Sequence, residues 1–405
     1  MANETITSVK GMKAAALHCG IKASGKPDVA LLVTEAPAAA AAVFTRNKVV
    51  GAPVIVGRQH IKHGTLRACV TNSGCANVCT GERGIRDALE MCRLTADGLG
   101  AGDIREVLPF STGVIGHFLP MDKIRTGIPQ AVAQLSDSEE AGRAFALGIM
   151  TTDLAPKSAS TSLTLGGKRV TVAGHCKGSG MIAPNMGPPQ ATMLAYVATD
   201  AAVDRRALAK LIPSIADETF NCVTVDQHTS TSDSFVIMAN GLAGNKKITG
   251  GAELQKLAKA LLEVSDSLAR QIARDGEGAT KFVTVTVTGA ATKADAKRAA
   301  EAIANSPLVK TAIHGGDPNW GRFVSAAGYS GAKMIADKSA CKVGRIAVFR
   351  NGRPTTIDLS KVEAEMKQKE VDITVDLGAG GKHTHRVYTC DLSREYITIN
   401  ADYHT

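Results

Sequence analysis

A long helical pattern runs almost directly into an alternating pattern between residues 252 and 289. The stretch AELQKLAKALLEVSDSLARQIARDG (252–276) repeats apolar residues about every 3.6 positions over several turns, which predicts an amphipathic helix. The next stretch, KFVTVTVTG (281–289), alternates valine and threonine, which predicts a strand. The chain is therefore expected to combine helices with strands.

Four further helices are predicted. Residues 82–100 carry an apolar stripe that ends in a glycine suited to a C-cap. Residues 136–150 begin with Ser136 three positions before Glu139, the spacing of a capping box. A third helix begins at the cap residue Asp204 and should be kinked or interrupted at Pro213, and a fourth covers residues 293–306.

Strands are predicted over residues 234–241 and through a β-rich C-terminal third. Asn351-Gly352 lies between two extended runs and predicts a hairpin. Residues 371–378, HRVYTCDLS (385–393) and YITINADY (396–403) complete this region. Helices segregated from largely antiparallel strands favour an α+β layered fold, with sheets packed between helices. A doubly wound nucleotide-binding fold is the alternative, although no G-x-G-x-x-G stands between a strand and a helix.

Composition excludes several classes of protein. The 405 residues are 44% hydrophobic, enough for a well-buried core in two lobes. The net charge of +9 is scattered and no basic block is interleaved with aromatics, so neither nucleic acid nor membrane is an expected partner. No signal-peptide pattern or long apolar run is present, and nine cysteines, an odd number, indicate reduced thiols in the cytoplasm rather than disulfides or a metal site.

The stretch MIAPNMGPPQATMLAYVA (181–198) places a rigid loop before a threonine that opens an apolar run. If the Ala191–Thr192 bond were cut, the new α-amine of Thr192 would lie within reach of its own hydroxyl. With a reference pKa of about 7.7–8.0, that amine suits a general base for a weak threonine nucleophile. The structural alternative is a loop that leads into a core element.

Other motifs allow both a chemical and a structural interpretation. FSTGVIGHFLP (110–120) has small residues after an apolar run, which suits either an oxyanion hole or a tight turn. Glu277, between two glycines, suits either a ligand ammonium or a solvated turn. TVDQHTSTSD (224–233) suits either a binding wall or a polar loop, and at the C-terminus Asn400 and Thr405 are too polar for a simple trailing strand.

Taken together, these motifs resemble the ornithine acetyltransferase (glutamate N-acetyltransferase) family of arginine biosynthesis. The match covers roughly residues 10–405, and the motifs occur in the family's order. They are NSGCANVCTG, STGVIG, TTDLAPK, KGSGMIAPNM with ATML, TVDQHTSTSD, RDGEGATKF, GDPNWGR and ITINADYHT. One departure is clear: Gly187-Pro188-Pro189-Gln190 stands where the family usually runs directly from Pro-Asn-Met into Ala-Thr-Met-Leu.

The resemblance implies a layered α/β/β/α sandwich of the DmpA/ornithine acetyltransferase type. A larger lobe would cover about residues 1–280 and a smaller C-terminal α/β lobe about 281–405. It also implies self-cleavage between Ala191 and Thr192, giving an α chain of 1–191 and a β chain of 192–405. The site residues it implies are Thr192 as nucleophile, Thr112 and Gly113 as the oxyanion hole, and Thr151, Lys177, Thr192, Glu277, Asn400 and Thr405 as substrate-binding positions.

The implied reaction is a ping-pong transfer of acetyl from N-acetylornithine to glutamate through an acetyl-enzyme. The resemblance implies no required cofactor and no metal, leaves acetyl-CoA open as a second acetyl donor, and suggests a heterotetramer of two α and two β chains. Two alternatives stay open: an N-terminal-nucleophile aminopeptidase or amidase, and an unprocessed relative that only binds amino acids.

Overall fold

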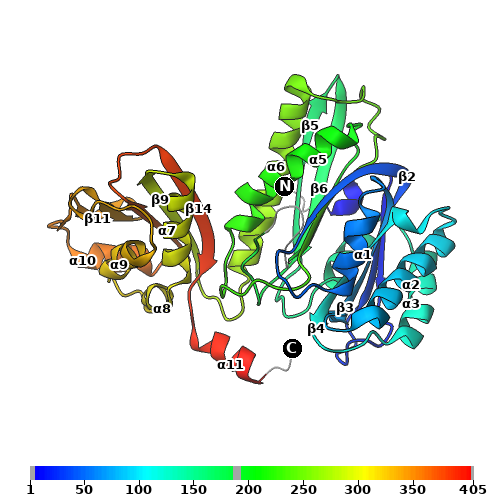
Figure 1. The fold of residues 1–405 in the computed structure, drawn as a ribbon, viewed down its shortest axis with the longest axis horizontal. Helices are drawn as coiled ribbons and strands as arrows, with labels where there is room; N and C mark the ends of the chain where they lie inside the picture. The colour runs from blue at the N-terminus through cyan, green and yellow to red at the C-terminus, as the bar shows by residue number, and fades with distance from the viewer. Residues whose placement is uncertain (1–4, 186–192, 403–405) are drawn as a thin grey trace. The chain divides into compact units, whose positions relative to one another are not determined.

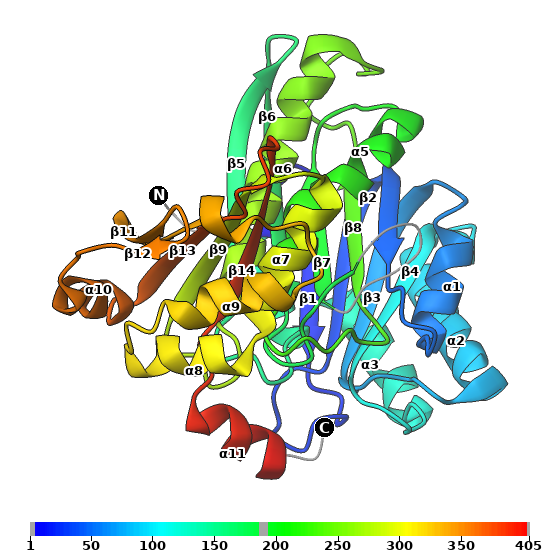
Figure 2. The ribbon, with the colours of Figure 1, turned by 60° about the vertical axis from the view of Figure 1, so that its left-hand side comes forward.

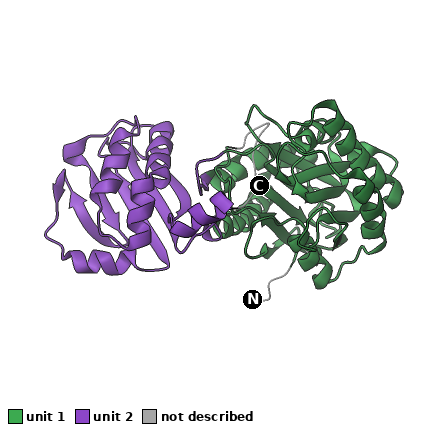
Figure 3. Ribbon diagram, turned by 90° about the horizontal axis from the view of Figure 1, so that it is seen from below, with its two compact units in different colours: residues 1–221, 229–272, 405 green, residues 222–228, 273–404 purple. Residues whose placement is uncertain are grey.

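The chain divides into two units. The computed structural model describes residues 5–185 and 193–402. Unit 1 comprises Met1–Asn221 and Thr229–Ile272, and unit 2 comprises Cys222–His228 and Ala273–His404 (Figure 3). The predicted Ala191–Thr192 cleavage site, the Gly187–Gln190 insertion and Thr405 lie outside the described residues.

Unit 1 is built on an eight-stranded sheet in the order β4-β3-β2-β8-β7-β6-β5, with β1 paired to β2 (Figure 1). Its strands are β1 (Met12–Leu17), β2 (Val29–Phe44), β3 (Thr65–Cys75), β4 (Val107–Val114), β5 (Lys157–Leu165), β6 (Lys168–Lys177), β7 (Leu194–Thr199) and β8 (Ser234–Ala239). Its helices are α1 (Ala52–His60), α2 (Gly81–Leu99), α3 (Met121–Ala133), α4 (Glu139–Gly148), α5 (Arg205–Glu218) and α6 (Gly251–Arg274), the last of which ends in unit 2.

The sheet of unit 1 folds over on itself along the long strand β2. Pairing between β2 and β3 shifts between Val33 and Ala38, and only the second half of β2 pairs with β8. The ring centroids of Phe110 in β4 and Tyr196 in β7 are 4.9 Å apart, although three strands separate β4 from β7 in the sheet order. The two halves therefore face each other and enclose a hydrophobic core.

Helices cover the outer faces of this folded sheet (Figure 1). On one face, α2 and α3 pack on β2 and β3 through a cluster that includes Met91 and Ile128. On the other, α6 passes close to β6, because a Cβ on Gly174 would lie 3.1 Å from Leu268 Cδ1. Unit 1 is thus the layered α/β/β/α sandwich that the resemblance implies, and the predicted α+β fold class is confirmed.

Unit 2 has a six-stranded sheet in the order β12-β11-β10-β13-β9-β14, in which only the β13–β9 pair is parallel. Helices α7 and α9 pack against each other and against strands of this sheet (Figure 2). The strands are β9 (Phe282–Ala290), β10 (Ala340–Val343), β11 (Ile346–Arg350), β12 (Arg353–Pro354), β13 (Glu370–Asp376) and β14 (His383–Cys390). The helices are α7 (Lys293–Asn305), α8 (Pro307–Gly315), α9 (Gly321–Tyr329), α10 (Leu359–Met366) and α11 (Arg394–Asp402).

Three sequence predictions need correction. The helix expected from Ser136 begins at Glu139, and its cap is Ser138, whose hydroxyl accepts a hydrogen bond from the N–H of Ala141 (3.2 Å). Helix α5 is capped by Asp204 as predicted but continues without interruption through Pro213. The stretch predicted as a C-terminal strand from Tyr396 forms helix α11 instead.

Candidate active site

Thr112 and Gly113 lie at the end of β4, where its parallel pairing with β3 becomes irregular at Gly74 and Cys75. Gly113 has φ +128°, and a Cβ there would lie 2.4 Å from the carbonyl carbon of Gly74. Only glycine fits this conformation and this close approach. An oxyanion hole requires backbone N–H groups aimed at one point, and the irregular end of β4 is compatible with that requirement.

Lys177 ends β6 inside a buried cluster of charges. Its Nζ donates to Thr151 Oγ1 (2.7 Å) and lies 3.7 Å from Asp153 Oδ2. The other carboxylate oxygen of Asp153 accepts from Lys157 Nζ (2.7 Å) and from the N–H of Gly178 (2.6 Å). The predicted residues Thr151 and Lys177 are therefore in direct contact, and Asp153 and Lys157, which the sequence reasoning did not assign, support them.

The ionic state of Asp153 is set by its two lysine neighbours. Burial alone would raise the pKa of this carboxyl, but Lys177 and Lys157, together with the N–H of Gly178, hold it well below its ordinary value. Asp153 is therefore ionised at neutral pH and pairs as a carboxylate with both lysines. A cation held in this way at the end of β6 suits a substrate carboxylate.

Asp153→Asn is expected to lower the free energy of unfolding by about 3–5 kcal/mol at pH 7, since it removes the buried carboxylate with which Lys157 and Lys177 are paired. The pKa of Asp153 is depressed in the folded state. Its contribution to the free energy of unfolding is therefore present at pH values above its ordinary pKa of 3.8 and is lost as the pH falls below that value. Thermal melting should thus show a large difference from the wild type at pH 7 and a shrinking one below about pH 4. Asp317→Asn, at an exposed ion pair with Arg322, is the control and should change little. Equal melting temperatures at pH 7 for the Asp153 variant and the wild type would contradict this account.

The residues that follow Thr192 are fixed next to Lys177. Met193 is fully buried, and its carbonyl accepts a hydrogen bond from the N–H of Ser234 (2.6 Å). Leu194 begins β7 and is the register partner of Lys177 in the antiparallel β6–β7 pair. The chain therefore enters β7, two positions after Thr192, directly beside the lysine of the buried cluster.

Glu277 and Asn400 belong to unit 2 and contact each other. The Nδ2 of Asn400 in α11 donates to Glu277 Oε2 (2.9 Å), and Glu277 is 6% exposed. The next residue, Gly278, has φ +66°, and a Cβ there would lie 2.4 Å from the backbone N of Tyr396. This close approach holds the turn with Glu277 against the start of α11. A buried carboxylate with one amide partner suits an ammonium ligand.

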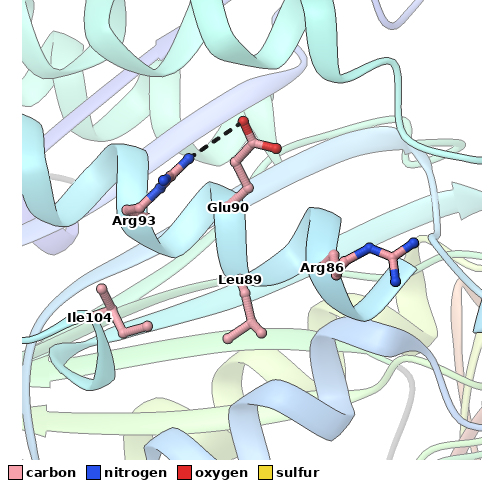
Figure 4. Close-up of a pocket in the computed structure, with 5 residues that line it drawn as sticks. All are labelled: Arg86, Leu89, Glu90, Arg93 and Ile104. Carbon is pink, nitrogen blue, oxygen red and sulfur yellow. Dashed lines mark ion pairs between the residues drawn. The ribbon is translucent and has the colours of Figure 1, made fainter. Parts of the chain in front are cut away.

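A surface depression elsewhere in unit 1 contains none of the predicted site residues. It lies over α2 and is lined by Arg86, Leu89, Glu90, Arg93 and Ile104 (Figure 4). The charged ends of these side chains form surface ion pairs, such as that between Arg93 and Glu90 at 3.9 Å. We assign this depression no role in the chemistry.

The described residues offer no group of three or more His, Cys, Asp or Glu side chains placed to hold a metal ion. Cys75 is buried and Cys79 is exposed, and both are free thiols. Within the part of the chain that the structure describes, no helix is long and apolar enough to cross a membrane.

Comparisons with known proteins point to the same family as the sequence motifs. The model of the ArgJ family matches residues 13–405. The arginine biosynthesis bifunctional protein ArgJ of Geobacter sulfurreducens is 49% identical over 401 residues, covering 98% of this chain and 100% of the relative. The protein of the same name from Symbiobacterium thermophilum is 47% identical over 405 residues, covering 99% and 98%.

Among solved structures, the crystal structure of the arginine biosynthesis bifunctional protein ArgJ from Bacillus halodurans is similar with a TM-score of 0.51 and 42% identity. The match covers 52% of this chain and 100% of that chain. Together with the family model and the relatives, it confirms the predicted glutamate N-acetyltransferase (ornithine acetyltransferase) family and the acyltransferase class of enzyme. With a family model over residues 13–405 and relatives aligned along nearly their whole length, the chain belongs to the ArgJ family.

Proposed function

We propose that this chain is a self-cleaving acetyltransferase of arginine biosynthesis, with Thr192 as an N-terminal nucleophile that moves acetyl from N-acetylornithine to glutamate. The observation that carries the proposal is the pairing of Lys177 with Leu194. It brings a buried cation suited to a substrate carboxylate beside the strand that begins two residues after Thr192. Both substrates are α-amino-acid derivatives, so both offer that carboxylate.

Self-cleavage would unmask the nucleophile. The Thr192 hydroxyl oxygen attacks the carbonyl carbon of Ala191, the peptide C–N bond breaks, and the leaving nitrogen takes the proton as the α-amine of Thr192. Water then hydrolyses the ester, which leaves a carboxylate on Ala191 and a free hydroxyl on Thr192. The products are an α chain of 1–191 and a β chain of 192–405. The solved Bacillus halodurans chain matches in full yet covers 52% of this chain, close to the share of residues 192–405, and supports such a division.

Acetyl transfer would follow in two half-reactions. Thr192 Oγ attacks the acetyl carbon of N-acetylornithine, the Thr192 α-amine receives the hydroxyl proton and passes it to the departing ornithine nitrogen, and an acetyl ester remains on Thr192. The neutral α-amine of glutamate then attacks that ester, and the proton returns to Thr192 Oγ. The N–H groups of Thr112 and Gly113, at the irregular end of β4, would stabilise both oxyanions, each donor being worth about 10²–10³ in rate.

The remaining roles follow from the charges of the side chains. Lys177 with Thr151 would bind the α-carboxylate, Glu277 with Asn400 would bind the ammonium group of ornithine, and Thr405 would complete the substrate-binding positions. These steps require no cofactor, and acetyl-CoA would serve as an alternative acetyl donor to Thr192. We further propose a cytoplasmic heterotetramer of two α and two β chains, with N-acetylornithine and glutamate as its small-molecule partners.

Intact mass and N-terminal sequencing of the purified protein test the cleavage, with two chains and a new N-terminus at Thr192 as the expected result. A single chain of the full 42.1 kDa would favour an unprocessed amino-acid-binding protein instead. Incubation with N-acetylornithine, with and without glutamate, tests the transfer. Acetylglutamate should accumulate in step with ornithine, whereas ornithine release that is independent of glutamate would identify an amidase.

A further inference from the structure

The loop between β1 and β2 is wrapped around the carboxylate of Asp28, which is fully buried. The backbone N–H groups of Cys19 and Ile21 each donate to it at 2.7 Å, and that of Lys22 donates at 2.9 Å. His18 Nδ1 lies 2.9 Å from the same carboxylate. Burial would raise the pKa of Asp28, but the backbone donors and His18 hold it below its ordinary value. An ionised group with this many fixed donors holds the backbone at Lys22 in one position.

The side chain of Lys22 extends from this loop over the irregular β3–β4 pairing. A Cβ on Gly74 would lie 3.2 Å from Lys22 Cγ, and Gly74 is the register partner of Gly113 in the proposed oxyanion turn. The Nζ donates to the carbonyl of Pro27 (2.7 Å). No carboxylate among the described residues forms an ion pair with it, so two ammonium N–H donors are left for a ligand.

The charge of Lys22 interacts with the Lys177 cluster. Burial lowers the pKa of Lys22 to about 8, Lys177 and Lys26 act in the same direction, and Asp28 and Asp153 oppose them. The charged groups that act on this ammonium are therefore two carboxylates, each of which accepts hydrogen bonds from other donors, and two lysines. Counting Lys157, which pairs with Asp153, three lysines (Lys22, Lys157 and Lys177) accompany two carboxylates (Asp28 and Asp153), so the cluster has more ammonium groups than carboxylates.

We propose that Lys22 is a substrate-binding residue that shares with Lys177 the α-carboxylate common to both substrates. This inference rests on the proposed function. The two ammonium groups repel each other. A substrate carboxylate that binds between them offsets this repulsion and accepts a charge-assisted hydrogen bond from each. The packing of Lys22 on Gly74 would also fix the distance from the bound carboxylate to the turn at Gly113, which orients the acetyl carbonyl for attack.

Steady-state kinetics of Lys22→Met test the proposal, because methionine keeps the apolar stem and removes the charge. The KM values for N-acetylornithine and for glutamate should both rise by about 10–100-fold, the effect of losing a hydrogen bond to a charged group, while kcat changes much less. Lys22→Arg keeps the positive charge, so both KM values should stay within a few-fold of those of the wild type. Lys168→Met, at an exposed lysine at the start of β6, is the matched control and should leave both KM values unchanged.

Unchanged KM values in Lys22→Met would overturn the proposal, as would a rise for glutamate alone, which would assign Lys22 to the side-chain carboxylate. If Lys22→Met does not fold, the pH dependence of KM in the wild type and in Lys22→Arg tests the proposal instead. The wild-type KM should rise above about pH 8 as Lys22 loses its proton, and Lys22→Arg should not show that rise. Identical pH profiles of KM in the wild type and in Lys22→Arg would overturn the proposal. A wild-type protein that transfers no acetyl group would instead contradict the proposed function.

Discussion

Thr192→Ala is expected to leave one uncut chain of 42.1 kDa with no detectable acetyl transfer. Alanine removes the only oxygen that the proposed mechanism uses for both the attack on Ala191 and the attack on the acetyl group. Without cleavage, no α-amine is released to act as base, so the nucleophile and the general base are lost together. The transfer rate should fall by at least about 10⁴-fold, as for other nucleophile deletions. Denaturing electrophoresis and an ornithine-release assay measure the two effects.

Two further variants sharpen this test. Thr192→Ser keeps the hydroxyl and should still cleave and transfer, at reduced rates, because serine lacks the methyl group that restricts the threonine rotamer. Thr164→Ala, at an exposed threonine of β5, should cleave and transfer like the wild type. Two chains or retained transfer in Thr192→Ala would remove Thr192 from the mechanism and direct attention to another hydroxyl.

The elements with strong local patterns could be predicted from the sequence alone. The helix predicted over residues 252–276 is α6, whose apolar stripe, including Leu261 and Leu268, is fully buried. The Asn351–Gly352 turn joins β11 to β12, with φ values of 50° and 72° at the two positions. In both cases the residues that fix the conformation lie within one short segment, so no distant contact was needed to predict it.

The predictions that failed depended on choices between competing local signals. Isoleucine, threonine and tyrosine near the C-terminus favour a strand, yet Ser393 accepts a hydrogen bond from the N–H of Tyr396 (3.4 Å) and caps a helix. Helix α11 has no buried residues, so no sheet packing selects the strand that the side chains favour. The capping-box spacing predicts Ser136 as the cap of α4. Ser138 also precedes Glu139, however, and only Ser138 lies next to the helix.

The support for the candidate site could not be found from the sequence. Motif order predicts Thr151 and Lys177, but the role of Asp153 depends on its burial between Lys157, at the start of β5, and Lys177, at the end of β6. Lys22 lies about 150 residues before Lys177, and its position depends on how the β1–β2 loop closes around Asp28. Such contacts depend on the tertiary fold and have no local sequence pattern.

Gly113→Ala is expected to abolish most activity by a steric route. The new Cβ would lie 2.4 Å from the carbonyl carbon of Gly74 and 2.7 Å from the backbone N of Cys75, neither of which can move without displacing β3. The residue would also have to keep φ +128°, which side chains rarely adopt, at a strain of about 1–3 kcal/mol. Acetyl transfer should fall by at least about 10²-fold as the turn N–H groups lose their aim. The cleavage rate should fall with it if the same turn stabilises both oxyanions.

Gly116→Ala separates backbone strain from the close approach at Gly113. Gly116 lies three residues further along and also has a positive φ of +85°, but a Cβ there would meet no atom within 4 Å. It should therefore lower the melting temperature modestly and leave transfer near the wild-type rate. If both variants lose transfer equally, strain alone explains the loss and the turn at Gly113 has no special role. If only Gly113→Ala loses transfer, and the variant is still folded at the assay temperature, the loss comes from the close approach at Gly113, which displaces the backbone N–H groups there.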